Sequence, residues 1–298
     1  MSRRGWVLFG LMSVIWGVPY LLIKVADGGV SVPVLVFARV AIGSAVLLPL
    51  AIRRGQIRVL AGRWRWLALF AVVEIMLPWA LLSDAERHLS SSLTGLLIAV
   101  VPIIGLVLAR LTGGPEQLTA VRWAGLLAGL AGVALLAGLG DHAGASGASG
   151  TGIAIILFAS VCWAVGTILS TRLKGLPQRP FLTTAMQMLV GGAIILALSA
   201  ATGEFSGFHL SQVSLRSWLA LLYLIGPGSI LALSAYGIAV RSLPTSTVAT
   251  YAYVNPVVAV ILGTTILSEK LTPMMLVGGA LIVAAVALIV WRRGSPGH

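Results

Sequence analysis

The chain has 298 residues, of which 58% are hydrophobic and 9% charged, and it carries a formal net charge of +12. A soluble domain carries roughly 25% charged residues because its surface faces water, so this composition indicates a chain surrounded mostly by lipid. The basic excess does not indicate nucleic-acid binding, because the Lys and Arg residues lie in short gaps between apolar runs. The single Cys162 lies inside an apolar run, which excludes a disulfide framework.

Ten apolar runs are long enough to cross a bilayer, for which a helix needs about 20 residues. The connections between them are short and leave no room for a second, soluble domain. The first run follows basic residues, as in a signal peptide, but its apolar part is too long, so we expect it to be retained as a span. The sequence therefore predicts an all-α integral membrane protein with these spans: 6–25, 32–52, 66–85, 91–111, 119–139, 151–172, 180–201, 215–239, 245–266 and 272–292.

The basic residues are distributed unequally between the two sides of the predicted bundle. With the N-terminus inside, fifteen of the twenty Lys and Arg residues fall in cytoplasmic segments. The outer loops hold Arg87, Arg216 and Lys270, while Lys24 and Arg39 lie inside spans. Since cytoplasmic loops carry an excess of positive charge, we expect both termini in the cytoplasm and the chain in a bacterial-type inner or plasma membrane.

Two stretches, 89–119 and 243–272, share an order of features. Each opens with Leu and small polar residues, continues as an apolar run with a central proline, and closes on Glu-x-Leu-Thr. The two prolines, Pro102 and Pro256, are 154 positions apart, and the opening leucines have the same separation. This constant offset indicates an internal repeat.

The segment 140–150 is rich in Gly, Ala and Ser and is typical of a flexible linker. It separates a first repeat, 1–139, from a second repeat, 151–298, each with five predicted spans. Because five is odd, the second repeat enters the membrane inverted relative to the first. Inverted repeats occur in many secondary transporters, which bind their substrate near the midplane where the halves meet.

These features together resemble the EamA family of the drug/metabolite transporter superfamily. The resemblance rests on the ten-span inverted repeat, on Trp16, Gly17 and Lys24 in the first span, on Arg39 in the second, and on a Pro…Glu-x-Leu-Thr unit in each half. It covers essentially the whole chain. It implies a transporter that exports small metabolites or drugs, similar to the YddG-like exporters of amino acids. Glu74 has no counterpart in that pattern, so its role rests on physical arguments.

Trp16 and Trp163 each lie about ten residues into a span and occupy equivalent positions of the two repeats. A tryptophan at this depth that faced lipid would leave its indole N–H without a partner. We therefore expect the two rings to line one central cavity. The alternative is helix packing with each N–H bonded to a neighbouring carbonyl. Further aromatic candidates for the cavity lie inside other spans: Tyr20, Trp79 and Tyr236.

The ninth span carries polar residues where the fourth is apolar. Tyr251 and Asn255 are four residues apart and share one helix face. Pro256 removes an intrahelical hydrogen bond, so we expect a hinge or kink there and at Pro102. Substrate binding by this face and simple packing of a kinked helix are both open interpretations.

Charged side chains within spans are costly and are functional by default. Helix rise places Arg39 and Glu74 about 8 Å apart in depth, which an arginine side chain can bridge. The open interpretations are a static ion pair, a proton taken up by Glu74 that couples export to the proton gradient, and binding of a substrate carboxylate by Arg39 with its repeat counterpart Gln187. Lys24 is expected to snorkel towards the interface.

The remaining polar residues give no sign of catalysis. The four His are scattered without metal-ligand spacing, and no nucleophile–base constellation or cofactor motif is present, so we expect no enzyme, no metal and no cofactor. A charged cluster follows the third span and is expected in the solvated outer loop: Asp84, Glu86, Arg87 and His88.

The leading prediction is a secondary transporter that exports amino acids with apolar or aromatic side chains by alternating access through a midplane cavity. An exporter of lipophilic cationic drugs is the alternative, and it would need an accessible anion with cation–π partners. A membrane-embedded enzyme or lipid-handling protein, or a scaffold, is disfavoured. The expected partners are a small-molecule substrate, the lipid bilayer and protons, and no nucleic acid.

Overall fold

In the computed structural model, the residues that can be described are 3–27, 29–53, 64–113, 119–136, 149–172, 180–201, 203, 213–232, 235–236 and 251–291. Their secondary structure is entirely helical. The elements are α1 (Arg3–Gly17), α2 (Pro19–Asp27), α3 (Val32–Arg53), α4 (Trp64–Ala71), η2 (Val72–Met76), α5 (Leu77–His88), α6 (Ser91–Ile98), α7 (Val101–Leu111), α8 (Ala120–Leu136), α9 (Gly150–Arg172), α10 (Pro180–Ala201), α11 (Leu215–Ile225), η4 (Gly226–Leu231), α14 (Tyr251–Ile266) and α15 (Pro273–Trp291).

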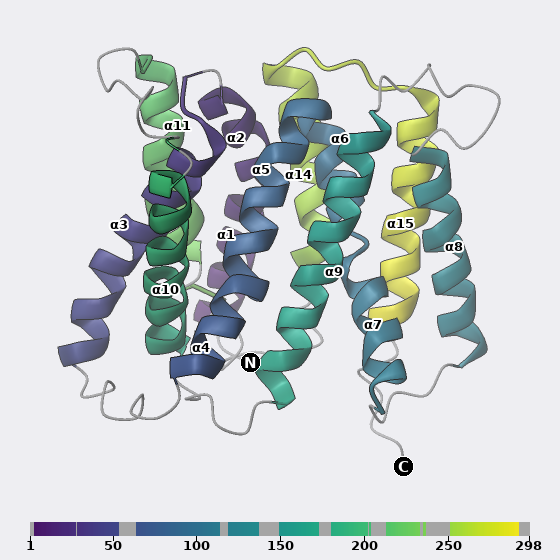
Figure 1. The fold of residues 1–298 in the computed structure, drawn as a ribbon. Coiled ribbons are helices and arrows are strands. Elements are labelled where there is room, and N and C mark those ends of the chain that lie inside the picture. The colour runs from purple at the N-terminus through teal and green to yellow at the C-terminus, as the bar shows by residue number, and fades with distance from the viewer. Residues whose placement is uncertain are drawn as a thin grey trace.

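Six stretches of these helices are long and apolar enough to cross a membrane, and four shorter apolar stretches accompany them. Each overlaps one of the ten predicted spans, and the expectation of an all-α membrane protein is confirmed. The helices form one bundle in which α1 begins and α15 ends at the same end (Figure 1). We call the opposite end, which carries the α5–α6 and α14–α15 connections, the distal end.

The helix pairs follow the repeat. At one edge of the bundle α3 packs against α10, and at the other edge α8 packs against α15 (Figure 1). The second pair is held close by small residues, because a Cβ at Gly132 would lie 2.7 Å from the Gly278 carbonyl oxygen. Small residues at such contacts let helix backbones approach within a membrane. The remaining helices pack between the two pairs.

Two of the spans that the sequence predicts as continuous are interrupted near their centres. The first ends as α1 at Gly17 and resumes as α2 at Pro19, because proline has no N–H to continue the helical hydrogen bonds. In the fourth span the helix breaks at Ala99 and Val100, and Pro102 lies in the first turn of α7 instead of kinking one continuous helix. The equivalent Pro256 lies inside the continuous α14.

Two further spans contain a π-helix, a wider helical turn that is rare and frequently found at functional sites. In the third span it covers Val72–Met76, and in the eighth it covers Gly226–Leu231. Their first residues are 154 positions apart, which is the offset of the repeat. Both halves therefore carry the same irregularity, and the sequence analysis predicted neither.

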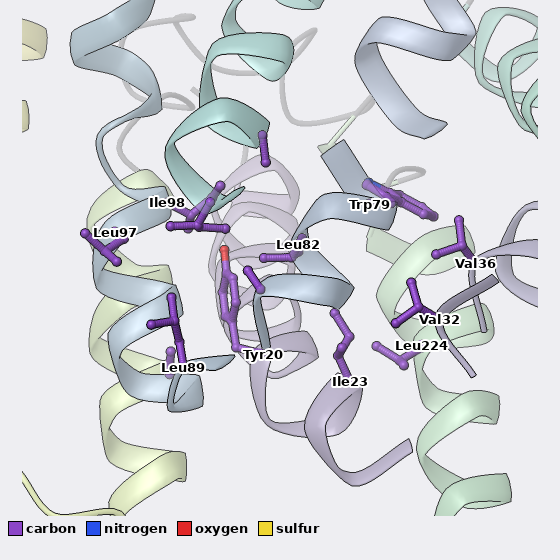
Figure 2. Packing of buried hydrophobic residues seen from close by; sticks show 14 of the residues in the cluster. Tyr20, Ile23, Val32, Val36, Trp79, Leu82, Leu89, Leu97, Ile98 and Leu224 are labelled. Carbon is purple, nitrogen blue, oxygen red and sulfur yellow. The ribbon is translucent and has the colours of Figure 1, made fainter. Parts of the chain in front are cut away.

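The apolar core runs through the middle of the bundle and includes aromatic residues that the sequence placed inside spans. Figure 2 shows Tyr20 of α2 among Leu82 of α5 and Ile98 of α6, and it shows Trp79 beside Val36 of α3. Tyr20 is 5% exposed and Trp79 is 8% exposed. Both side chains therefore lie inside the protein and not against lipid.

Candidate functional site

The interruption of the first span lies against the π-helix of the eighth. The Trp16 indole N–H donates to the Gly228 carbonyl oxygen at 3.2 Å. A Cβ at Gly228 would lie 3.8 Å from the Pro19 ring. On its other side the interruption packs closely on α14, where a Cβ at Gly17 would overlap the side chain of Val258. Irregular backbone from two spans thus meets at mid-depth, as in transporters whose discontinuous helices form the substrate site.

Three aromatic rings meet beside this contact, and we call Trp16, Tyr236 and Tyr251 the central aromatic cluster. The Trp16 ring lies 5.0 Å from Tyr251 and 5.4 Å from Tyr236 between centroids, and the two tyrosine rings are 6.2 Å apart. These separations are within the range of favourable aromatic pairs. The cluster joins residues from the first, eighth and ninth predicted spans. Three of the sequence candidates are therefore brought together.

Asn255 lies one helical turn after Tyr251, on the face that the sequence predicted for both. Oriented by its hydrogen-bonding surroundings, its amide nitrogen donates to the carbonyl oxygens of Ser13 at 2.9 Å and Tyr251 at 3.2 Å. The amide nitrogen therefore bridges α14 to α1. Any contact between Asn255 and a ligand would use the amide oxygen.

Glu74 is the residue at which the two halves differ most in chemistry. It lies in the first π-helix and packs against Gly166 of α9, where a Cβ would lie 2.9 Å from both Cα and Cβ of Glu74. By the repeat offsets, Gly166 corresponds to Pro19 and Glu74 corresponds to Gly228. The same helix-to-π-helix contact thus occurs twice, with a carboxylate in one copy and a glycine in the other.

Tyr236 and Tyr251 of the central aromatic cluster both lie within electrostatic range of the Glu74 carboxylate. Within the described part of the chain, its buried Oε2 atom has no hydrogen-bond partner. The static ion pair with Arg39 that the sequence allowed is wrong for this conformation, because the salt bridges of the described residues do not include it. Glu74 instead occupies an apolar and aromatic setting.

Arg39 lies on α3 with its guanidinium carbon 3.9 Å above the centre of the Trp79 ring. It is 4% exposed, and in the described residues its Nε and Nη1 atoms have no hydrogen-bond partner. Trp79 follows Glu74 by five residues, so Arg39 contacts the third span little more than one helical turn from Glu74. Arg39 is buried and Glu74 is half-buried with a buried Oε2 atom, and the two side chains do not pair with each other.

Gln187 lies on α10, which packs against α3. A Cβ at Gly43 would overlap Met188, and a Cβ at Gly192 would lie 3.2 Å from Val40. The two helices therefore run antiparallel, and Gln187 lies beyond Gly43, at a different level from Arg39. Its amide nitrogen is buried and is also without a partner among the described residues. A joint contact of Arg39 and Gln187 with one carboxylate is not supported by this arrangement.

The other candidates lie in separate places. Trp163 of α9 is half-buried against the core, and within the described residues its indole does not repeat the bond that Trp16 makes. Lys24 does not snorkel: its ammonium donates to the carbonyl oxygens of Glu86, at 2.8 Å, and of Leu89. The prediction of a solvated Glu86 is wrong, because α2, α6 and α9 pack around the end of α5 and leave it 1% exposed.

Two positions that shape this site are not among the candidates from the sequence. Gly166 and Gly228 are small residues that let a helix approach a π-helix, and neither stood out in a glycine-rich chain. The sequence does contain a signal for Gly228. Gly226, Pro227 and Gly228 follow one another inside an apolar run, and Gly and Pro are unfavourable in the interior of a regular helix.

Interrupted helices that meet around buried polar side chains, inside a bundle of apolar helices, are the architecture of many membrane transporters. The chain belongs to the EamA-like transporter family, which it matches over residues 3–138 and 150–291. The resemblance noted in the sequence is therefore confirmed, and the protein is a cell-membrane transporter and not an enzyme.

Similar proteins support this assignment. The chain is 32% identical to the inner membrane transporter YedA of Escherichia coli (strain K12), over 95% of this chain and 90% of that protein. It is 28% identical to a protein of Streptantibioticus cattleyicolor named a probable terminal-alkyne amino-acid exporter, over 97% and 94% of the two chains. A solved crystal structure with 20% identity has a TM-score of 0.67 and covers 97% of this chain and 98% of that chain, which shows a shared fold.

Proposed function

We propose that this transporter exports zwitterionic amino acids with apolar or aromatic side chains. The observation that carries the proposal is the pair of opposite side chains at Glu74 and Arg39. Both have buried polar atoms without hydrogen-bond partners among the described residues, and they do not pair with each other. A buried charge without a partner is costly. A zwitterion supplies both missing partners, with its ammonium group at Glu74 and its carboxylate at Arg39.

The aromatic side chains near these charges favour an apolar or aromatic substrate. Trp16, Tyr236 and Tyr251 contact one another, and the two tyrosines lie within electrostatic range of Glu74. Ring stacking adds about 0.5–1.5 kcal/mol per aromatic pair beyond area burial. The similarity to a protein named as an amino-acid exporter is consistent with this substrate class.

We further propose ten spans in two inverted five-span repeats, 1–139 and 151–298, with both termini in the cytoplasm and 140–150 as the linker. In this arrangement the distal end is the outer end. The irregular segments of the first, third, fourth and eighth spans then all lie near mid-depth, where alternating access requires the two halves to rock about a fixed site. Reporter fusions at the C-terminus and in the α5–α6 connection test the orientation.

Export itself is tested with purified protein in proteoliposomes by counterflow of labelled phenylalanine. Unlabelled competitors separate the contributions of the charges: phenylalanine, its amide, which lacks the carboxylate, and 3-phenylpropanoate, which lacks the ammonium. We expect phenylalanine to compete and each single-charge analogue to compete at least tenfold more weakly. The Glu74→Gln and Arg39→Met variants should remove the preference for the ammonium and the carboxylate respectively.

Matched controls are Asp84→Asn and Arg110→Gln, which alter more exposed charges on α5 and α7. They should leave counterflow near the wild-type rate. Equal competition by phenylalanine and its amide in wild-type protein would contradict the zwitterion proposal.

Export of a lipophilic cation is the second candidate, and the unpaired Glu74 beside two tyrosines favours it. A cation would satisfy Glu74 but would leave the Arg39 guanidinium without an acceptor, so we rank it below the zwitterion. Transport of tetraphenylphosphonium, with no competition by phenylalanine, would reverse that ranking.

A further inference from the structure

Glu86 is a buried acid at the distal end of α5 that the proposed substrate site does not use. Its side chain is 1% exposed. In the part of the chain that the structure describes, neither carboxylate oxygen has a hydrogen-bond partner. This setting differs from that of an ordinary surface glutamate, which is hydrated, and from that of a structural buried glutamate, which is hydrogen-bonded.

The charged groups around Glu86 are already engaged elsewhere. The Lys24 ammonium donates to two carbonyl oxygens at the end of α5. Asp27 lies 3.5 Å from the Arg87 guanidinium. Glu269 accepts hydrogen bonds from Ser91 and Ser92 at the start of α6. Lys24, Glu269 and Asp27 all lie within electrostatic range of the Glu86 carboxyl group, but none donates a hydrogen bond to it.

The titratable groups that face Glu86 come from three elements. On α2 they are Tyr20, Lys24 and Asp27, and in the α14–α15 connection the group is Glu269. On α5 itself the neighbours in sequence are Asp84, Arg87 and His88. Among the described residues, α6 and the first turn of α9, which also pack here, contribute no titratable side chain. One cation and two anions therefore surround a carboxyl group that has no donor.

A carboxylate in this position would lack both water and hydrogen bonds, and two neighbouring anions would repel it. A buried group in such a setting is neutral rather than charged. We propose that Glu86 is a proton-binding site at the outer gate of the transporter, and that it carries its proton while this end is closed.

In this scheme the Lys24 ammonium occupies two positions, one in the closed state and one in the open state. In the closed state its ammonium binds the Glu86 and Leu89 carbonyl oxygens and ties α2 to α5. When the gate opens, water reaches Glu86 and accepts its proton. The resulting carboxylate attracts the Lys24 ammonium away from the two carbonyl oxygens. In the reverse direction, a proton taken from the outer solution neutralises Glu86 and allows closure. The proton released on opening and the proton taken up on closing both exchange with the outer solution, so Glu86 makes closure of the gate depend on the outer pH without carrying protons across the membrane; this inference rests on the proposed export function.

The contacts at the distal end fit such a gate. Lys24 joins α2 to α5, Glu269 joins the α14–α15 connection to α6, and Gly152 at the start of α9 packs on His88 and Leu89. All three must change if the helices separate there. Glu269 would have to lose hydrogen bonds from Ser91 and Ser92 in order to take up a proton. Among the described residues, the Glu86 carboxyl group has no such hydrogen bond to lose.

The test compares wild-type protein with Glu86→Gln, which mimics the protonated acid, and with Asp84→Asn as the matched control on the same helix. The infrared spectrum of each protein in lipid at pH 7 reports the carbonyl stretch of protonated carboxylic acids. We expect the Glu86→Gln spectrum to lack a component that wild type and Asp84→Asn share. In wild type, raising the pH of the outer solution should slow counterflow, because closure requires a proton on Glu86. Glu86→Gln should still perform counterflow, but this dependence on the outer pH should be lost.

An infrared spectrum of Glu86→Gln identical to that of wild type overturns the inference, as does a dependence of counterflow on the outer pH equal to that of wild type. The two proposals fail separately. If wild-type protein moves no amino acid, the substrate proposal is wrong, but the infrared comparison still reports whether Glu86 holds a proton.

Discussion

The carboxylate of Glu269, in the second repeat, accepts a hydrogen bond from the backbone N–H of Ser92, in the first repeat, at 2.9 Å. The same carboxylate accepts from the Ser91 N–H at 2.8 Å and from both serine hydroxyl groups. These N–H groups belong to the first turn of α6, where a helix lacks internal partners and favours an anion. The Glu-x-Leu-Thr sequence of one half therefore caps a helix of the other. Its repeat counterpart, Glu116, lies outside the described residues.

We predict that Glu269→Gln lowers the thermal stability of the purified protein. The substitution replaces charge-assisted hydrogen bonds with neutral ones, and it turns an amide N–H group towards N–H donors. A loss of about 1–2 kcal/mol corresponds to a decrease in Tm of about 2–8 °C. Thermal unfolding in detergent measures it. Lys270→Gln, at the exposed neighbouring position, should change Tm by less than a quarter of that amount.

The stabilisation by Glu269 should depend on pH. Burial alone would raise the pKa of the Glu269 carboxyl group, but the hydrogen bonds from Ser92 and Ser91 outweigh it and hold the pKa below its usual value. A group whose folded pKa is lowered stabilises fully above its unfolded pKa of about 4.3, and this contribution is lost as the pH falls through the folded value. The Tm difference between wild type and Glu269→Gln should be constant above pH 6 and shrink below pH 4. A difference that grew with acidity would contradict this.

Gly166→Ala should disable transport, because the added methyl group would overlap the Glu74 carboxylate and press on its backbone. Overpacking of this kind costs about 1–3 kcal/mol, and at this position it also displaces the proposed ammonium-binding group. We expect counterflow to fall at least tenfold. Gly105→Ala is the matched control, since a Cβ there meets no atom within 4 Å, and it should transport normally.

Trp16→Phe should weaken substrate affinity while keeping the aromatic face. The phenylalanine ring cannot donate to the Gly228 carbonyl, so the contact between the first span and the second π-helix loses its hydrogen bond. A loss of about 1 kcal/mol is about a fivefold increase in the half-saturating substrate concentration. Trp123→Phe, on a side chain that is 53% exposed, should leave the concentration unchanged. If Trp16→Phe and Trp123→Phe changed the half-saturating concentration equally, the hydrogen bond of Trp16 would have no specific role in substrate binding.

Arg39→Lys should reduce transport although it retains the positive charge. Lysine lacks the planar guanidinium that stacks on Trp79 and presents two donors to a carboxylate. A cation–π contact of about 0.5–2 kcal/mol corresponds to a decrease in kcat/KM of about two- to thirtyfold. Arg110→Lys on the exposed surface of α7 serves as the control. Full activity of Arg39→Lys would show that Arg39 contributes charge alone.

The helical architecture could be predicted from the sequence because composition and apolar run length depend directly on the lipid surroundings. The shared face of Tyr251 and Asn255 could be predicted too, since it follows from helical spacing within one element. Glu86 could not be placed, because its burial depends on α2, α6 and α9 closing around the end of α5. Spacing along one chain segment carries no information about which other helices cover it.

The separation of Arg39 from Glu74 could not be predicted for a related reason. Helix rise gave their relative depth, but the direction in which the Glu74 side chain points depends on the π-helix that begins at Val72. Nothing in an apolar run distinguishes an inserted residue from an ordinary one. The pairing of Arg39 with Trp79 instead follows from how α3 and α5 pack.

The π-helix also changes how substitutions along the third span should be interpreted. One inserted residue rotates everything that follows by about 100° relative to an uninterrupted α-helix, since a turn holds 3.6 residues. A helical wheel drawn through Trp66 and Trp79 without a correction at 72–76 therefore places residues of α5 on the wrong side of the bundle. The eighth span needs the same correction at 226–231. A mutational scan of either span should show a periodicity that shifts phase at its centre, and that phase shift is measurable without any knowledge of the substrate.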